Sequence, residues 1–305
     1  MAELIKIVKG QLTENEPMAR HSSYGVGGPA TAFIIPKNVN DLSNILRFAH
    51  SHKIKTFFVG SGSNILVSDT GIDGLVISPV KAFTHLSFKE GNIEAESGVM
   101  LGRLVRESIN RDLTGFEGLG GVPGTLGGAL MMNAGAFGHE ISNYLVSITL
   151  MSMDGNLHIL QKEEIDFSYR YSSIDKEAFI VSALFSLKNC DAQSIQEKRK
   201  LASDKRKSSQ PLKYRSAGSV FKNPNSTTAA GYLIDQAGLK GLRQGDAEIS
   251  KKHANFFINH GKATAKDIST LIQIARKNVK EKFNIMLELE IKTFGFNERE
   301  LMPNG

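Results

Sequence analysis

GLGGVPGTLGGALMMNAGAFG, the sequence of residues 118–138, places eight glycines in 21 positions. Glycine loses more backbone freedom on folding than any other residue, so this density has an entropic cost that folding alone rarely requires. One interpretation is a loose loop. The second interpretation is a segment whose backbone has to come close to a bound group. A second glycine-rich segment in the sequence favours this second interpretation.

That second segment is VGSGSNILV, residues 59–67, a tight loop expected directly after a strand. Successive small residues let backbone N–H groups turn toward an anion such as a pyrophosphate. Neither segment has the usual dinucleotide fingerprint, because Ile65 stands where a third small residue belongs. Gly25-x-Gly27-x-x-Ala30 follows no apolar strand, and Gly261-Lys262 is followed by Ala263, which excludes a phosphate loop. If a dinucleotide binds, a different fold holds it.

Composition indicates an ordinary globular protein. The 305 residues are too many for one small core, so two or three domains are expected. Hydrophobic residues make up 41% and charged residues 22%, which argues against disorder. Met1 to Gln11 lacks the apolar centre of a signal peptide, and no apolar run is long enough to cross a membrane. The lone Cys190 excludes an internal disulfide and a cysteine metal cage, so we expect a cytoplasmic protein with no metal.

The formal charge of +6 and the pI near 9.2 suggest an anionic partner. A nucleic-acid binder would combine clustered Lys and Arg with aromatic platforms. The densest basic run, Lys198 to Lys207, has no aromatic residue and contains Asp204. An anionic small substrate such as a nucleotide sugar explains the charge more simply, and we expect no nucleic-acid partner.

Hydrophobic spacing predicts a mixed α+β chain without a regular βαβ rhythm. A polar helix from Asp191 to Lys207 marks a domain boundary near 192–211. Thr264 with Asp267 three residues on is a capping-box pattern that opens another helix. Further predicted helices are 41–51, 101–113 and 230–237, and predicted strands are 31–35, 56–59, 75–77, 146–151, 157–160, 179–187, 255–259 and 286–293, with hairpins at 90–92 and 154–156.

Three polar clusters are candidates for chemistry. Arg170 lies between Tyr169 and Tyr171, either as a surface stack or as a functional cation. Ser219 follows a glycine turn, either as a turn residue or as a reactive hydroxyl, and without a Gly-x-Ser-x-Gly elbow a serine hydrolase is not expected. Glu288 and Glu290 alternate with apolar residues, so they share one strand face, which could simply be solvated.

In their order along residues 21–295, these segments resemble the UDP-N-acetylenolpyruvoylglucosamine reductase (MurB) family. The motifs that carry the resemblance are HSSYGVGGPA (21–30), GSGSN (60–64), VPGTLGGA (122–129), YRYS (169–172), SAGSVFKNP (216–224) and ELEI (288–291). Each is weak alone, but their joint order is specific. The absence of a long tyrosine-bearing insertion after Tyr171 matches the shorter, type II-like subclass, and the glycines at 118–121 depart from the serine common there.

The resemblance implies a two-lobed FAD-binding domain of the vanillyl-alcohol-oxidase (PCMH) type plus a C-terminal α/β substrate-binding domain. The expected boundaries are 1–80 and 81–195 for the FAD-binding lobes and 196–305 for the substrate-binding domain. By position, Arg170, Ser219 and Glu290 are the expected catalytic residues, and Tyr169, Lys222, Asn223 and His253 the expected substrate contacts. The expected FAD contacts are Gly60, Ser61, Gly62, Ser63, Asn64, Gly121, Pro123, Gly124, Thr125, Gly127, Gly128, Asn133, Ala134, Gly135 and Ala136.

The implied reaction uses NADPH and non-covalent FAD to reduce the enolpyruvyl ether of UDP-N-acetylglucosamine enolpyruvate, in peptidoglycan precursor synthesis. Arg170 would steady the developing charge, Glu290 would hold the enolate form, and Ser219 would deliver a proton with help from Lys222. A monomer is the expected state. Two alternatives stay open: an oxidase of small alcohols or sugars on the same scaffold, and a non-catalytic nucleotide-sugar-binding protein, which would be colourless.

Overall fold

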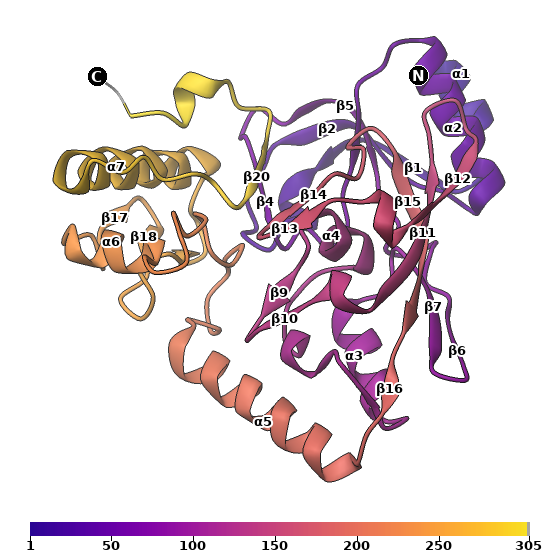
Figure 1. The fold of residues 1–305 in the computed structure, drawn as a ribbon. Coiled ribbons are helices and arrows are strands. Elements are labelled where there is room, and N and C mark those ends of the chain that lie inside the picture. The colour runs from indigo at the N-terminus through magenta and orange to yellow at the C-terminus, as the bar shows by residue number, and fades with distance from the viewer. Residues whose placement is uncertain (304–305) are drawn as a thin grey trace. The chain divides into compact units, whose positions relative to one another are not determined.

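The computed structural model describes residues 1–303, and the chain divides into two compact units that we describe separately (Figure 1). Unit 1 comprises residues 1–15, 31–61 and 74–205, and unit 2 comprises residues 16–30, 62–73 and 206–305. Two short N-terminal segments therefore belong to the same unit as the C-terminal hundred residues. The domain boundaries expected at 80 and 195 do not anticipate this, because they assumed contiguous domains.

The first core of unit 1 lies between a four-stranded sheet and a helix. The sheet order is β1-β2-β5-β3, with β3 parallel to β5. Leu42, Ile45, Leu46 and Ala49, the predicted apolar stripe of α2, are all fully buried. The Asn38 side chain accepts a hydrogen bond from the Asp41 N–H and so caps this helix. The bounds are α1 (Ala2–Ile7), β1 (Gln11–Pro17), β2 (Pro29–Ile35), α2 (Val39–Ser51), β3 (Thr56–Phe58) and β5 (Ile72–Ile77).

The second core of unit 1 is built on an antiparallel five-stranded sheet of order β12-β11-β15-β7-β6. Helices α3 and α4 contribute Leu104, Leu126 and Leu130 to this core. The bounds are β6 (Leu86–Lys89), β7 (Asn92–Glu96), α3 (Leu101–Ile109), β8 (Leu113–Thr114), α4 (Leu126–Met131), β9 (Gly135–Ala136), β10 (His139–Glu140), β11 (Leu145–Met151), β12 (Leu157–Gln161), β13 (Phe167–Ser168), β14 (Tyr171–Ser172), β15 (Phe179–Ser186), β16 (Lys188–Asn189) and α5 (Ala192–Ser209).

Unit 2 has its own core between two helices, a three-stranded sheet of order β17-β18-β19 and a parallel pair, β4 with β20. Helix α7 begins with the predicted capping box, since Thr264 and Asp267 each accept the other's backbone N–H. The bounds are β4 (Ile65–Val67), α6 (Ala230–Gln236), β17 (Arg243–Gln244), β18 (Ala247–Ile249), β19 (Phe257–Asn259), α7 (Ala265–Phe283) and β20 (Lys292–Phe294); short 3-10 turns lie at 18–21, 117–119, 141–144, 162–164 and 298–300.

The predicted α+β class is confirmed, and most predicted elements appear within a few residues of their expected ends. The strand predicted at 286–293 is wrong for most of its length, because only Lys292–Phe294 forms a strand. Upstream of it, Leu289 makes a single antiparallel bridge with Phe221. The glycine-rich stretch is more ordered than a loose loop, since it contains α4 and β9, which pairs with β10 just beyond it.

No helix within residues 1–303 combines the length and the apolar character needed to cross a bilayer. Over the same residues there is no group of three or more His, Cys, Asp or Glu side chains placed to hold a metal ion.

Candidate functional site

Unit 1 brings the two glycine-rich segments together. A Cβ atom added at Gly60 would lie 2.2 Å from the Thr125 hydroxyl oxygen, so only glycine fits there. Thr125 belongs to the second glycine-rich segment and is 2% exposed. The same segment is joined to the end of β7, because the Gly127 N–H donates to the Ser97 carbonyl at 2.9 Å. The expected cofactor residues Gly60, Thr125 and Gly127 are thus neighbours in the folded unit.

Two serine hydroxyls beside these glycines are buried without a hydrogen-bond partner within the described residues, those of Ser61 and Ser97. Buried polar groups are almost always hydrogen-bonded, so two such hydroxyls suit a polar ligand. Together with the close approach of Gly60 to Thr125, they fit a nucleotide cofactor lying along this part of unit 1. Ser97 was not expected as a site residue, since no motif surrounds it in the sequence.

The segment 60–64 is divided between the two units, with Gly62, Ser63 and Asn64 in unit 2. Gly62 has φ +66°, and a Cβ there would meet the His21 carbonyl oxygen at 1.8 Å. Asn64 joins this loop to the C-terminal segment, because its side-chain nitrogen donates to the Glu290 carbonyl at 3.2 Å. Its carbonyl accepts the Lys292 N–H at 2.9 Å. The loop is therefore fixed next to the backbone of an expected catalytic residue.

The rest of the expected cofactor set is a series of turns in unit 1. Gly121 and Gly124 have φ of +80° and +137°, conformations that favour glycine. The Ala134 N–H donates to the Ala129 carbonyl at 2.7 Å, closing the end of α4. Pro123 and Gly128 are exposed, and Gly135 and Ala136 form β9. Asn133, in contrast, is fully buried.

Arg170 lies in the two-residue turn of the β13–β14 hairpin, with Tyr169 before it. Its φ is +57°, which is unfavourable for a residue with a side chain. The guanidinium carbon lies 5.0 Å from the centre of the Tyr169 ring, so the stack expected from the sequence is present. Such a conformation costs free energy that contacts of the surrounding residues must offset.

In unit 2, the segment that carries Ser219 (216–224, the serine segment) runs beside the segment that carries Glu290 (288–291, the glutamate segment). Ser219 bridges to Phe256, and the Val220 N–H donates to the Asn255 carbonyl at 2.8 Å. On the other side, the Glu290 N–H donates to the Val220 carbonyl at 2.8 Å. Both Ser219 and Glu290 are partly buried. Two of the three expected catalytic residues are therefore adjacent in one unit.

Lys222 has a different partner from the one expected. Its ammonium lies 2.6 Å from a Glu288 carboxylate oxygen, so it forms an ion pair there instead of assisting Ser219. The Asn223 side chain also has a partner within unit 2, because its oxygen accepts the Ala230 N–H at the start of α6 at 3.1 Å. Both residues follow Ser219 within residues 216–224, and their contact with the substrate stays a prediction.

His253, the last of the expected substrate contacts, packs against α6 and Phe256. Its ring lies 4.8 Å from the Phe256 ring, and the Nδ1 atom accepts the Asn255 N–H at 3.3 Å. Burial lowers the pKa of His253 below its ordinary value, with a smaller contribution from the nearby Lys240 charge. The imidazole is therefore held neutral, as an acceptor.

Asn255 is a residue that sequence reasoning missed. It is 3% exposed, and its side chain pairs with the backbone of Phe221, accepting the N–H at 2.9 Å and donating to the carbonyl at 2.8 Å. With its own carbonyl bound to Val220, it holds the serine segment from one side. The sequence contains only one indication of this role, which is that Asn255 is the first residue of the strand predicted at 255–259.

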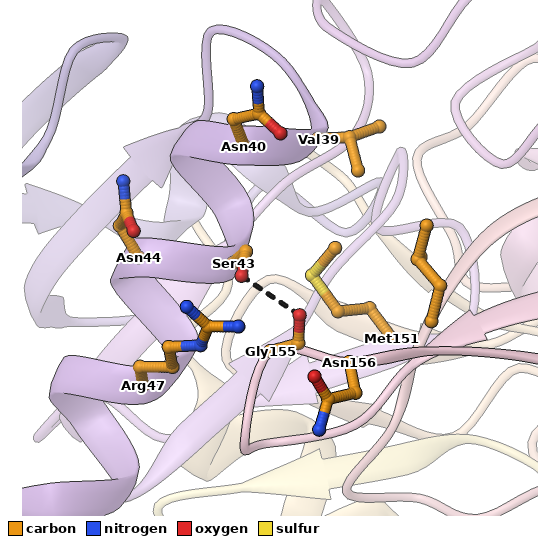
Figure 2. A pocket seen from close by; sticks show the side chains of 9 residues that line it. Val39, Asn40, Ser43, Asn44, Arg47, Met151, Gly155 and Asn156 are labelled. Carbon is orange, nitrogen blue, oxygen red and sulfur yellow. Dashed lines mark hydrogen bonds between the residues drawn. The ribbon is translucent and has the colours of Figure 1, made fainter.

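An open groove of about 520 Å³ lies between α2 and the β11–β12 hairpin of unit 1 (Figure 2). Ser43 and Arg47 on its wall already bind the Gly155 and Asp154 carbonyls, at 2.9 and 2.8 Å. None of the expected site residues lines it. The expected site residues, in residues 59–67, 118–138 and 216–224, therefore lie outside this groove.

The geometry and the sequence similarities together define a flavoprotein oxidoreductase. Residues 30–161 match the model of an FAD-binding domain, and residues 210–294 match that of the C-terminal domain of UDP-N-acetylenolpyruvoylglucosamine reductase. The chain belongs to the UDP-N-acetylenolpyruvoylglucosamine reductase (MurB) family, as the sequence motifs predicted.

The similarity to individual members extends over nearly the whole chain. The reductase of Clostridium novyi is 43% identical over 291 residues, which is 94% of this chain and 93% of that protein. The reductase of Caldanaerobacter subterraneus is 40% identical, with 97% of both proteins covered. The crystal structure of the enzyme from Thermus caldophilus superposes with a TM-score of 0.81 at 34% identity, covering 93% of this chain and 99% of that one.

Proposed function

We propose that this chain reduces the enolpyruvyl ether of UDP-N-acetylglucosamine enolpyruvate to UDP-N-acetylmuramate, with Arg170, Ser219 and Glu290 as its catalytic residues. One observation in particular supports this assignment. The Val220–Glu290 backbone bond aligns the serine segment with the glutamate segment in one unit. Membership of the reductase family gives the reaction class.

FAD, when bound, would supply the hydride chemistry for the methylene carbon of the enolpyruvyl group, with NADPH as the source of the hydride. Arg170 then offsets the negative charge that spreads into the substrate carboxylate, a contribution of about 3 kcal/mol for one preorganised donor. Glu290 hydrogen-bonds the developing enolate form, and the Ser219 hydroxyl delivers the proton to the neighbouring carbon. General-acid help of this kind typically contributes ~10²–10⁴ in rate.

Gly60, Ser61, Ser97 and Thr125 would hold the cofactor in unit 1, since they combine a close backbone approach with buried hydroxyls. Their contacts would be non-covalent. The purified protein should be yellow, and acid should release FAD. A colourless preparation that cannot be reconstituted with FAD would contradict the proposal.

The reaction itself is tested in its two halves. Ser219→Ala should slow reoxidation of the reduced flavin by UDP-N-acetylglucosamine enolpyruvate by at least roughly a hundredfold. Reduction of the flavin by NADPH should keep its wild-type rate. Stopped-flow absorbance of the flavin separates the two steps. Equal loss of both would show that Ser219 has a structural role instead.

We further propose that the enzyme is cytoplasmic and monomeric. NADPH and nucleotide sugars are both made inside the cell, which supports the location. Light scattering on the purified protein should give a mass near 33.3 kDa. A value near twice that would contradict the monomer.

A further inference from the structure

We propose that Asn133 is a positioning residue for Arg170. Its side-chain amide fixes the β13–β14 hairpin through the Ser168 carbonyl, and this holds the guanidinium in place. The inference rests on the proposed function, which gives Arg170 its role. It replaces the direct cofactor contact that the sequence motif predicted for Asn133.

The hydrogen bonds of the Asn133 amide all stay within unit 1. Its nitrogen donates to the Glu140 carboxylate at 2.8 Å and to the Ser168 carbonyl at 3.1 Å. Its oxygen accepts the Ser142 N–H at 3.4 Å. An amide nitrogen has two hydrogens, so both donors are used. The fully buried side chain has no donor left for a cofactor.

The hairpin that carries Arg170 needs such an anchor. Its ladder has only two residue pairs, Phe167 with Ser172 and Ser168 with Tyr171. Two-stranded hairpins are marginally stable on their own, and Arg170 adds an unfavourable φ of +57°. Two hydrogen bonds between Asp166 and Ser173, both of 2.9 Å, extend the hairpin, and contacts with neighbouring segments help to hold the turn in this conformation.

The hairpin is anchored on both strands to the end of α4. Asn133 holds the first strand through Ser168, and the Ser172 hydroxyl holds the second by donating to the Met131 carbonyl at 3.0 Å. Met131 is the last residue of α4, and Asn133 follows two positions later. The end of α4 thus binds both strands that flank the Arg170 turn.

The backbone conformation of Asn133 explains the residue type and suggests the experiment. Its φ is +41°, in the left-handed region that asparagine and glycine tolerate best. Glycine would keep this backbone but lose the amide. Asn133→Gly therefore removes the hydrogen bonds while leaving the backbone unstrained.

In stopped-flow measurements, Asn133→Gly should slow reoxidation of the flavin by UDP-N-acetylglucosamine enolpyruvate roughly ten- to a hundredfold, the cost of a misplaced catalytic group. FAD content, the visible spectrum and reduction by NADPH should stay near wild type. Asn284→Gly is the matched control: it is an exposed asparagine with φ +56° at the end of α7, and both half-reactions should be unchanged.

A double-mutant cycle tests the route through Arg170. In an Arg170→Ala background, Asn133→Gly should cause no further slowing, because the group that it positions is already gone. The inference would be overturned if the two substitutions slowed reoxidation by independent factors that multiply in the double variant. Loss of FAD from Asn133→Gly would also overturn it. If Asn133→Gly fails to fold, Ser172→Ala provides the test, because it removes the other anchor. It should slow the same half-reaction. A wild-type rate for Ser172→Ala would count against the inference.

Failure of the proposed function would look different. If Arg170→Ala itself leaves reoxidation unchanged, the catalytic assignment is wrong. If Arg170→Ala slows reoxidation and Asn133→Gly does not, only the positioning role is wrong.

Discussion

At the scale of single residues, Glu288 and Glu290 show how two identical side chains two positions apart come to differ. Leu287 and Ile291 on either side of the pair are buried, and Leu289 between the two glutamates is partly buried against the same core, so the apolar alternation predicted from the sequence is present. The Glu288 side chain is 71% exposed and pairs with Lys222, whereas Glu290 is partly buried beside the serine segment.

We predict that Glu290→Gln slows reoxidation of the reduced flavin by at least roughly a hundredfold, a lower bound for lost acid–base help. A carboxyl that acts in the transition state should affect turnover far more than substrate affinity. Stopped-flow absorbance of pre-reduced enzyme measures this directly.

Glu288→Gln is the matched control, and its rate should stay within a few-fold of wild type. Its ion pair is too exposed to contribute much to stability. An equal or larger loss at Glu288 would mean that the active carboxyl has been placed at the wrong position.

His253 gives a prediction for the pH dependence of stability. In the folded chain its pKa lies below the ordinary value of 6.5, mainly because of burial. Between the two values the unfolded chain binds more protons, so the free energy of unfolding should fall as the pH is lowered through that window. His253→Gln should flatten this part of the curve, as measured by urea unfolding between pH 7 and the acid limit of folding. An unchanged slope would show that other groups cause it.

At the scale of secondary-structure elements, the start of α7 is held by two side chains. Thr264 accepts the Asp267 N–H, and Asp69 accepts the Ala265 and Lys266 N–H groups, both at 2.9 Å. The first of these caps was predicted from local spacing. The second could not be, because Asp69 is nearly two hundred positions away.

We expect Asp69→Ala to lower the free energy of unfolding by about 1–2 kcal/mol, since it removes two hydrogen bonds and a charge that favours the helix N-terminus. Thr264→Ala should cost about 1 kcal/mol. Asp69→Asn should lie between wild type and Asp69→Ala, because it keeps an acceptor without the charge. Urea unfolding of the three variants tests the order, and a larger loss for Thr264→Ala would contradict it.

Sequence reasoning worked where an element is decided by its own residues. The stripe of α2, the capping box of α7 and the hairpins at 90–92 and 154–156 all formed as predicted. It failed for 286–293, whose alternation correctly indicated which residues are buried but not that Glu288 and Glu290 would lie outside a strand. Alternation of apolar and polar residues indicates which side of a segment is buried. A strand also needs a neighbouring strand to pair with. Here Phe221 pairs with Leu289 through a single bridge.

Sequence motifs predict which segments belong to the candidate site. They do not predict the contacts that its residues make. Sequence motifs alone mark the segments at 60–64, 122–136, 169–172 and 216–224. The roles of Asn133, Ser97 and Asn255 do not follow from motifs, because each depends on a backbone group far away in the sequence. Lys222 was assigned to Ser219 because it is near in sequence, whereas its ammonium is bonded to Glu288.

At the scale of the whole molecule, the C-terminal residues are not a self-sufficient domain. Tyr24 and Leu66, from the segments 16–30 and 62–73, are fully buried in the core of unit 2. Strand β20 pairs only with β4, which lies in the second of these segments.

We therefore predict that a fragment of residues 206–305 will show helical circular dichroism without a cooperative thermal transition, whereas the full chain will unfold cooperatively. The fragment would lack two buried side chains, the partner of β20 and the Asp69 cap. A sharp transition of the isolated fragment would show that these contacts are dispensable.

The interleaving of the two units has a consequence for synthesis of the chain. Residues 16–30 and 62–73 leave the ribosome before residues 206–305, which complete their core, have been translated. At typical elongation rates this wait lasts on the order of ten seconds. During it, Tyr24 and Leu66 have no finished core to enter, which makes the nascent chain a candidate for chaperone binding. A stop codon at position 206 would remove residues 206–305, and the two early segments would then never gain their partner.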